Sequence, residues 1–94
     1  QIQPRINMNP FGNIVWGQSV SIGCSVTDVQ VGGTFILHKS HGSFIQSVET
    51  TSSSATFNIP QVTFEEEGSF QCQFKVRVSN EDYSSILSDS VRLN

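Results

Sequence analysis

Residues that favour helices are scarce in this chain of 94 amino acids, which has one alanine, three leucines and two lysines. Glycine, serine, threonine, valine, phenylalanine and isoleucine dominate instead, and together they favour strands and turns. No helical hydrophobic period persists beyond one turn. We therefore expect an all-β chain with a single two-layer core, because ~100 residues are too few for two cores.

Charge is also scarce, since 14% of the residues are charged and the net charge is −3. A chain without a basic surface is a poor partner for nucleic acid or for an acidic membrane. No apolar run approaches the ~20 residues that span a bilayer, and the polar opening QIQPRINMNP does not resemble a signal peptide. Because the sequence ends within a strand-like segment, VRLN, we expect residues 1–94 to be a single domain excised from a longer, multi-domain protein.

Motifs for catalysis and for cofactors are missing. The two histidines, His38 and His41, lie on an expected turn with no carboxylate near them in sequence, which makes a poor metal site. The run EEEG has no second carboxylate cluster that would suit calcium, and no G-x-S-x-G motif is present. We predict that the chain is not an enzyme and that it uses no metal or cofactor. It also has no N-x-S/T sequon, so N-glycans should not shield any face.

Two cysteines are present, Cys24 and Cys72, with 47 residues between them. This distance differs from the close spacing of zinc ligands and of C-x-x-C redox motifs. Each cysteine lies on the apolar face of an alternating run, VSIGCSV or SFQCQF. The pattern indicates a buried disulfide between two sheets, formed in an oxidising compartment. Two free buried thiols are the alternative.

Short alternating runs, separated by turn residues about every 8 to 12 residues, fill the sequence. We expect the apolar side chains of each run to face inward, and Pro60 to end one run because proline cannot donate to a ladder. The segments TDVQVGG, HKSHG, ETTSSS and SNEDYSS are expected to be loops or turns. The expected extended segments are Ile2–Met8, Ile14–Trp16, Val20–Val26, Phe35–Leu37, Ser43–Val48, Ala55–Ile59, Phe70–Val76 and Leu87–Leu93.

The run from Phe57 to Cys72 is the most specific pattern in the chain. It has the spacing of the immunoglobulin pattern L-x-I-x-x-V-x-x-x-D-x-G-x-Y-x-C, at Phe57, Ile59, Val62, Glu66, Gly68, Phe70 and Cys72. Together with the alternating run that contains Cys24, it makes nearly the whole chain resemble the immunoglobulin superfamily. The resemblance implies an immunoglobulin-like two-sheet antiparallel sandwich of the C2/I type, with about seven or eight strands and a disulfide between the sheets.

Departures from the pattern point to one branch of the superfamily. Leu37 stands close to where a tryptophan usually packs on the disulfide, and Phe70 replaces a tyrosine. No arginine stands in the segment before the Phe57 strand to pair with Glu66. The loss of the tyrosine hydroxyl is expected to cost ~1 kcal/mol. The segments FILHKSHGSF and SSILSDSVRL are similar to segments of the leukocyte-receptor branch. This branch includes killer-cell and leukocyte immunoglobulin-like receptors, Fc-alpha-type receptors and fish immune-type receptors.

The resemblance implies an extracellular domain of an immune cell-surface receptor that binds a cell-surface or soluble protein through end loops or through an elbow between domains. In the end loop SNEDYSS, the tyrosine offers contact area and the charges can set specificity. A plain polar hairpin end is the alternative. The loop TDVQVGG is expected at the same end. The ligand-binding candidates are Asn80, Glu81, Asp82 and Tyr83 in the first loop and Val29, Gln30 and Val31 in the second.

Four aromatic residues are candidates for contact with a neighbouring immunoglobulin-like domain or another partner. Trp16 precedes a glycine, near Phe11, and Phe64 lies in the crossover before the Phe70 strand. Packing of Trp16 on the first strand, as ordinary core, is the alternative. Phe44 lies beside the turn that follows Leu37, and an edge-strand packing role is its alternative.

Two other classes of function stay open. In an adhesion domain an exposed sheet face pairs with its counterpart on another cell, which predicts self-association of the isolated domain. In a structural spacer, or a secreted plasma protein of the same branch, no hydrophobic patch is expected at either end beyond those that adjacent domains cover.

Overall fold

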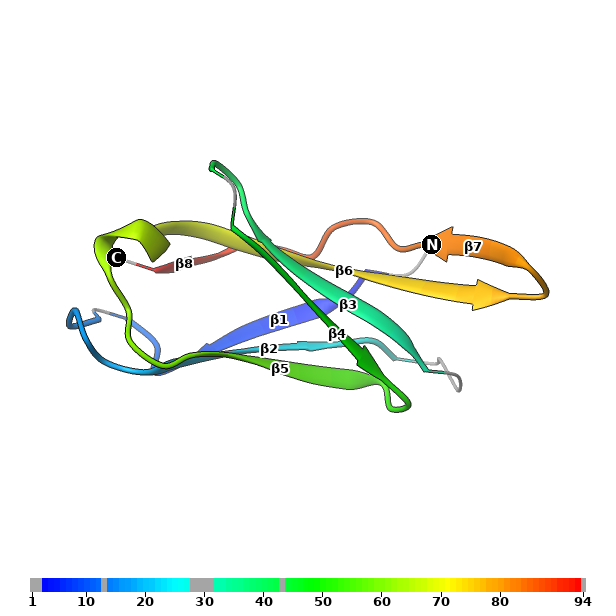
Figure 1. Cartoon of the computed structure of the whole chain (residues 1–94), viewed down its shortest axis with the longest axis horizontal. Coiled ribbons are helices and arrows are strands. Elements are labelled where there is room, and N and C mark those ends of the chain that lie inside the picture. The colour runs from blue at the N-terminus through cyan, green and yellow to red at the C-terminus, as the bar shows by residue number, and fades with distance from the viewer. Residues whose placement is uncertain (1–2, 13, 28–31, 43, 94) are drawn as a thin grey trace.

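The strands form two packed antiparallel sheets. A computed structural model describes residues 3–12, 14–27, 32–42 and 44–93, which form a sandwich of 44 × 22 × 19 Å (Figure 1). The small sheet has the order β1-β2-β5, and the large sheet has the order β4-β3-β6-β7, with β8 also paired to β6. The elements are β1 (Arg5–Asn9), β2 (Val20–Ser25), β3 (Gly33–Lys39), β4 (Ile45–Thr50), β5 (Ser54–Ile59), the 3-10 helix η1 (Phe64–Glu66), β6 (Gly68–Val78), β7 (Glu81–Ser84) and β8 (Val91–Leu93).

The core lies between the sheets because the sequence alternates. Every second residue of β2 is buried, and the inward residues of β3 and β6 meet them from the other sheet. The rings of Phe35 and Phe74 pack with centroids 4.8 Å apart. The expected inward residues of these strands are therefore confirmed. The buried hydrophobic residues are Met8, Ile14, Val20, Ile22, Cys24, Val26, Phe35, Leu37, Phe57, Ile59, Val62, Phe70, Cys72, Phe74 and Leu93.

The predicted disulfide joins Cys24 of β2 to Cys72 of β6, with 6.5 Å between the Cα atoms. Leu37 lies opposite Cys72 in the β3–β6 register and is fully buried, so an aliphatic side chain lies beside the disulfide. Phe70 is also fully buried, and its ring meets Phe44 edge to face with centroids 5.3 Å apart. Both unusual residues of the pattern thus pack into the core of the predicted sandwich.

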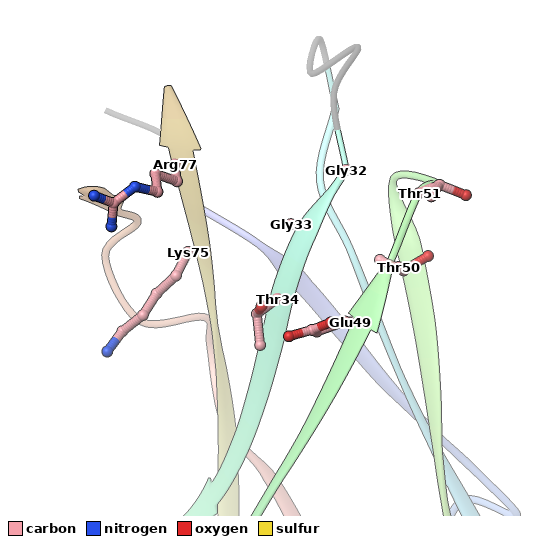
Figure 2. Close-up of a pocket in the computed structure, with 8 residues that line it drawn as sticks. All are labelled: Gly32, Gly33, Thr34, Glu49, Thr50, Thr51, Lys75 and Arg77. Carbon is pink, nitrogen blue, oxygen red and sulfur yellow. The ribbon is translucent and has the colours of Figure 1, made fainter. Parts of the chain in front are cut away.

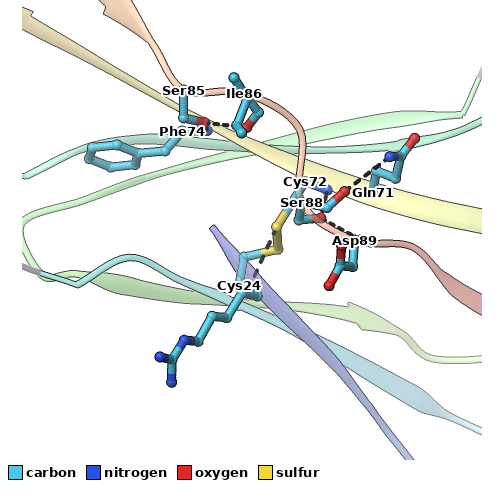
Figure 3. The surroundings of a disulfide bond; sticks show 9 residues. Cys24, Gln71, Cys72, Phe74, Ser85, Ile86, Ser88 and Asp89 are labelled. Carbon is cyan, nitrogen blue, oxygen red and sulfur yellow. Dashed lines mark hydrogen bonds between the residues drawn. A yellow bond between two sulfur atoms is a disulfide. The ribbon is translucent and has the colours of Figure 1, made fainter. Parts of the chain in front are cut away.

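Two serines continue the ladder along β6 between β7 and β8 (Figure 3). The N–H of Phe74 donates to the hydroxyl of Ser85 at 2.8 Å, and the N–H of Cys72 donates to the hydroxyl of Ser88 at 2.9 Å. The N–H groups of the two serines donate back to the carbonyl oxygens of Phe74 and Cys72, at 2.8 and 2.9 Å. Ser85 and Ser88 are three residues apart in the sequence, whereas their partners Phe74 and Cys72 are two residues apart. The serine hydroxyl groups make up for this difference by accepting the hydrogen bonds from β6.

Ser88 is the buried residue of the closing segment, and the expectation that Leu87 points inward is wrong. Ser88 is 2% exposed, whereas Leu87 is 39% exposed. The amide of Gln71 also donates to the carbonyl oxygen of Ser88 at 3.0 Å. A buried N–H needs an acceptor, which a serine hydroxyl supplies and a leucine cannot. Leu93 is buried as expected, and Val91 packs partly against the core.

The segment SNEDYSS was expected to be a loop, and this expectation is wrong. Ser79 and Asn80 have φ angles of 52° and 67° and form a two-residue turn between β6 and β7. A turn with two positive φ angles matches the twist of the flanking strands. The residues after it therefore pair with β6 as strand β7 instead of leaving the sheet.

The segment Ile14–Trp16 is likewise not a strand. The N–H of Gln18 donates to the carbonyl oxygen of Val15 at 3.0 Å, and Gly17 has a φ of 92°, as the third position of a type II turn requires. The N–H of Gly17 donates to the carbonyl oxygen of Val62 at 2.7 Å, and the N–H of Val62 donates to the carbonyl oxygen of Gln18 at 2.9 Å. These bonds tie the turn to the crossover that precedes η1.

Candidate functional site

Candidate binding residues lie at the two ends of the sandwich (Figure 1). The β6–β7 hairpin projects at one end, while η1 and the connection from β1 to β2 lie at the other. The hairpin and η1 therefore lie at opposite ends of the long axis of the molecule.

The β6–β7 hairpin presents a charged pair and a tyrosine. Arg77 of β6 forms an ion pair with Asp82 of β7 at 3.2 Å, and the hydroxyl of Tyr83 donates to Oε2 of Glu81 at 2.9 Å. All four residues of β7 are exposed. The side chains of the ion pair are 65% and 73% exposed, so the pair contributes little to stability. It restricts where the two charges lie on the hairpin.

Alternation places these groups on the two faces of the hairpin. Asp82 is opposite Arg77 in the register, on the outer face of the large sheet, whereas Tyr83 is opposite the inward residue Val76. Tyr83 is nevertheless 52% exposed, so the small sheet does not cover this part of the inner face. A partner at this end meets the charges on one face and the tyrosine on the other.

A hollow on the large sheet begins next to this hairpin (Figure 2). Thr34 of β3 lies between Glu49 of β4 and Lys75 of β6 in the register, so a carboxylate, a hydroxyl and an ammonium group form a row across the sheet. At Gly33 an added Cβ would collide with the carbonyl oxygen of Lys75, so this close approach of β3 to β6 requires glycine. The lining residues are Gly32, Gly33, Thr34, Glu49, Thr50, Thr51, Lys75 and Arg77.

The candidates of the second loop, Val29, Gln30 and Val31, lie outside the described residues. The described residue that follows them, Gly32, lines the hollow together with Arg77 of the hairpin strand. Gly32 and Arg77 therefore border the same hollow.

Trp16 and Phe64 come together at the opposite end. They are 49% and 74% exposed and line one mostly apolar hollow with Gly17, Gln61, Val62 and Thr63. Trp16 occupies the second position of the turn that bonds to Val62, and Phe64 is the first residue of η1. Hydrogen bonds between segments far apart in the sequence thus bring Trp16 and Phe64 to the same hollow.

A capping box holds η1 in place. The N–H of Thr63 donates to Oε1 of Glu66 at 2.8 Å, and the N–H of Glu65 donates to Oγ1 of Thr63 at 3.2 Å. The carboxylate of Glu66, which belongs to the family pattern, thus accepts a hydrogen bond from the residue that caps its own helix. The T-x-x-E spacing of Thr63 and Glu66 is the sequence signal that could have predicted this helix.

The other two aromatic candidates do not line this hollow. Phe11 is 85% exposed in the connection between β1 and β2. Phe44 is partly buried and packs on Phe70, which is the edge-strand packing alternative. The apolar hollow therefore involves only two of the four candidate aromatic residues.

Among the residues that the structure describes, no group of three or more His, Cys, Asp and Glu side chains is placed to hold a metal ion. In the same ranges, no helix has the length and apolar character needed to cross a bilayer.

The fold defines a class of protein: a two-sheet antiparallel sandwich whose disulfide ties β2 to β6. The model of the immunoglobulin domain family matches residues 15–85. The chain therefore belongs to the immunoglobulin domain family. No curated protein sequence matches it.

Two solved structures are similar to this chain. The crystal structure of CHIR-AB1 has a TM-score of 0.78 at 22% identity, over 98% of this chain and 96% of that chain. The human OSCAR ligand-binding domain has a TM-score of 0.74 at 16% identity, over 96% of this chain and 46% of that chain. At these identities the likeness demonstrates the shared fold.

Proposed function

We propose that this chain is an extracellular domain of an immune cell-surface receptor of the leukocyte-receptor type, and that it binds a protein ligand. One structural neighbour is a ligand-binding domain, and the segments FILHKSHGSF and SSILSDSVRL are similar to that branch of receptors. A disulfide across the sheets is in keeping with an oxidising, extracellular compartment. Immunoglobulin domains are typically binding or structural units, so we assign no catalysis to this one.

The β6–β7 hairpin end is the ligand site that we propose. The observation that carries this choice is Tyr83, which is half exposed and bonded to Glu81 on a strand with no buried residue. Tyrosines of this kind are enriched among the residues that dominate binding energy. The Arg77–Asp82 pair supplies oriented charges that select among partners.

Fluorescent multimers of the 94-residue domain, applied to a panel of leukocytes and serum proteins, test this proposal. We expect Tyr83→Ala to weaken binding about tenfold or more, while the matched aromatic variant Trp16→Ser at the other end leaves it unchanged. Loss of binding in Trp16→Ser with retention in Tyr83→Ala would move the ligand to the opposite end. A domain that binds nothing on the panel would point to a structural spacer.

The hollow around Trp16 and Phe64 supports a second role, contact with a neighbouring immunoglobulin-like domain of a longer protein. Apolar patches at the end of a domain are commonly covered by another surface. Trp16 is the one tryptophan of the sequence, so its fluorescence reports on this contact directly. We expect its emission to shift to shorter wavelength when adjacent domains are present. Emission identical to that of the isolated domain would contradict this role.

A further inference from the structure

Strand β4 is an edge of the large sheet and lacks the features that usually protect an edge (Figure 1). Its sequence, IQSVET, contains no proline, glycine or lysine, and Glu49 is its one charged residue. Ile45 on this strand is 67% exposed. Such an edge is a template for another strand.

The hydrogen-bond register determines which backbone groups of β4 are free. The N–H of Lys39 donates to the carbonyl oxygen of Phe44 at 3.2 Å, and the next pair of the ladder is His38 with Ile45. Hydrogen-bonded and non-hydrogen-bonded pairs alternate along an antiparallel ladder. The β4 residues whose backbone groups bond to β3 are therefore Gln46, Val48 and Thr50. Those whose N–H and C=O groups point to the open edge are Ile45, Ser47 and Glu49.

We propose that this edge pairs with the β4 edge of a second copy of the chain, antiparallel about a two-fold axis at Ser47. In this register Ser47 faces Ser47 of the second copy, and Ile45 faces its Glu49. All three outward residues then meet as hydrogen-bonded pairs, each of which exchanges two bonds. If the register between the two copies shifted by one residue, the free backbone groups of one β4 strand would face backbone groups of the other that already bond to β3. Centring the axis on Glu49 would oppose two carboxylates.

The outer face of the sheet fits the same pairing. Ile36 of β3 is opposite Ser47, and Ile45 is the diagonal neighbour of Ile36 on that face. Pairing about Ser47 therefore places Ile45 between Ile36 of its own copy and the methylene groups of Glu49 of the second copy, with the two Ser47 residues at the axis. Because each copy uses its single β4 edge, association stops at a dimer.

The other edges are less suited to this pairing. β7 is short and carries Asp82 on its open edge, and β1 lies between Pro4 and Pro10. On β5, the hydroxyl of Ser52 donates to the carbonyl oxygen of Ser54 at 3.0 Å and accepts from its N–H at 3.4 Å, which occupies the first free groups. The dimer proposal does not depend on the ligand proposal, because the β6–β7 hairpin lies at the other edge of the large sheet.

Sedimentation equilibrium of the oxidised 94-residue chain, from micromolar to near-millimolar concentration, tests the dimer. We expect a reversible monomer–dimer equilibrium. Ile45→Glu opposes a carboxylate to Glu49 of the second copy and should weaken the dimer about tenfold. The matched variant Ile45→Lys removes the same apolar side chain but opposes an ammonium group, and should not weaken it. A chain that stays monomeric throughout, or equal weakening by both variants, overturns the proposal.

Proline substitutions test the edge itself. Ser47→Pro removes an N–H that the β3–β4 ladder does not use, so we expect a folded monomer. Thr56→Pro, at the edge of β5, is the matched control and should leave the dimer intact. Amide hydrogen exchange then gives the register, since Ile45, Ser47 and Glu49 should become protected only as concentration rises. A dimer that persists in Ser47→Pro, or protection without this alternation, contradicts pairing at β4.

Discussion

At the scale of single residues, Ser88 supplies the acceptor for a buried N–H beside the disulfide. Replacing it by alanine leaves the N–H of Cys72 without that partner, and we expect the free energy of unfolding to fall by about 1–3 kcal/mol. Urea unfolding measures the loss. Ser90→Ala, at an exposed position of the same segment, is the control and should change stability by less than ~0.5 kcal/mol. Equal losses in the two variants would argue against the hydroxyl as the acceptor.

Leu37 allows a second prediction at this scale. The position beside the disulfide is completely buried and filled by a leucine, although a tryptophan is usual there in the family pattern. Leu37→Trp should therefore destabilise the domain, by about 1–3 kcal/mol, because the core around it is already packed. Leu37→Met, which nearly conserves volume, should cost less than ~1.5 kcal/mol. A stabilising Leu37→Trp in urea unfolding would show that the site adapts to the larger ring.

At the scale of elements, the β6–β7 turn holds two residues at positive φ, of which Ser79 is the less suited. The double variant Ser79→Asn with Asn80→Gly introduces the pair that such turns prefer. We expect it to stabilise the domain by about 1 kcal/mol and to raise the melting temperature by roughly 4–8 °C. Thermal unfolding monitored by circular dichroism measures the change. An unchanged melting temperature would mean that the hairpin frays before the domain unfolds.

The elements that sequence analysis predicted are those with their own periodicity. β2, β5 and β6 bury alternate side chains against a facing sheet, so their sequences alternate between apolar and polar residues. β7 buries nothing, so no alternation distinguished it from a loop, and Ser-Asn is not the usual dipeptide of its turn. The strand predicted at Ile14–Trp16 was wrong for a different reason, because the conformation of this segment depends on hydrogen bonds to Val62, which is distant in the sequence.

The candidate site was predictable to a similar extent. Residue type alone singled out Tyr83 and Trp16, because exposed aromatic residues near turns are binding candidates. Which aromatic residues lie together depends on tertiary contacts. Phe64 joins Trp16 through the crossover, whereas Phe44 packs on Phe70. The segment SSILSDSVRL stood out in the sequence only by its resemblance to one receptor branch, because the hydrogen-bonding role of Ser85 and Ser88 depends on the position of β6.

At the scale of the whole molecule, the disulfide ties the two sheets across 48 residues of sequence. Closing a loop of that length restricts the unfolded chain, and we expect its removal to cost about 4 kcal/mol. The double variant Cys24→Ala with Cys72→Ala, compared with the oxidised chain in urea, measures this loss. The reduced wild-type chain is the control and should unfold at a similar urea concentration. Unchanged stability in both would mean that the sandwich does not depend on the bond.

The hairpin end differs from the rest of the molecule in what mutation can do to it. The four residues of β7 contribute no side chain to the core, whereas the serines that follow hold the closing segment to the disulfide strand. Substitutions in the four residues of β7 therefore leave the core unchanged, whereas substitutions of the two serines affect folding. Across species, we expect rapid divergence at residues 81–84 next to near invariance at Ser85 and Ser88, which is the contrast that the proposed binding role predicts.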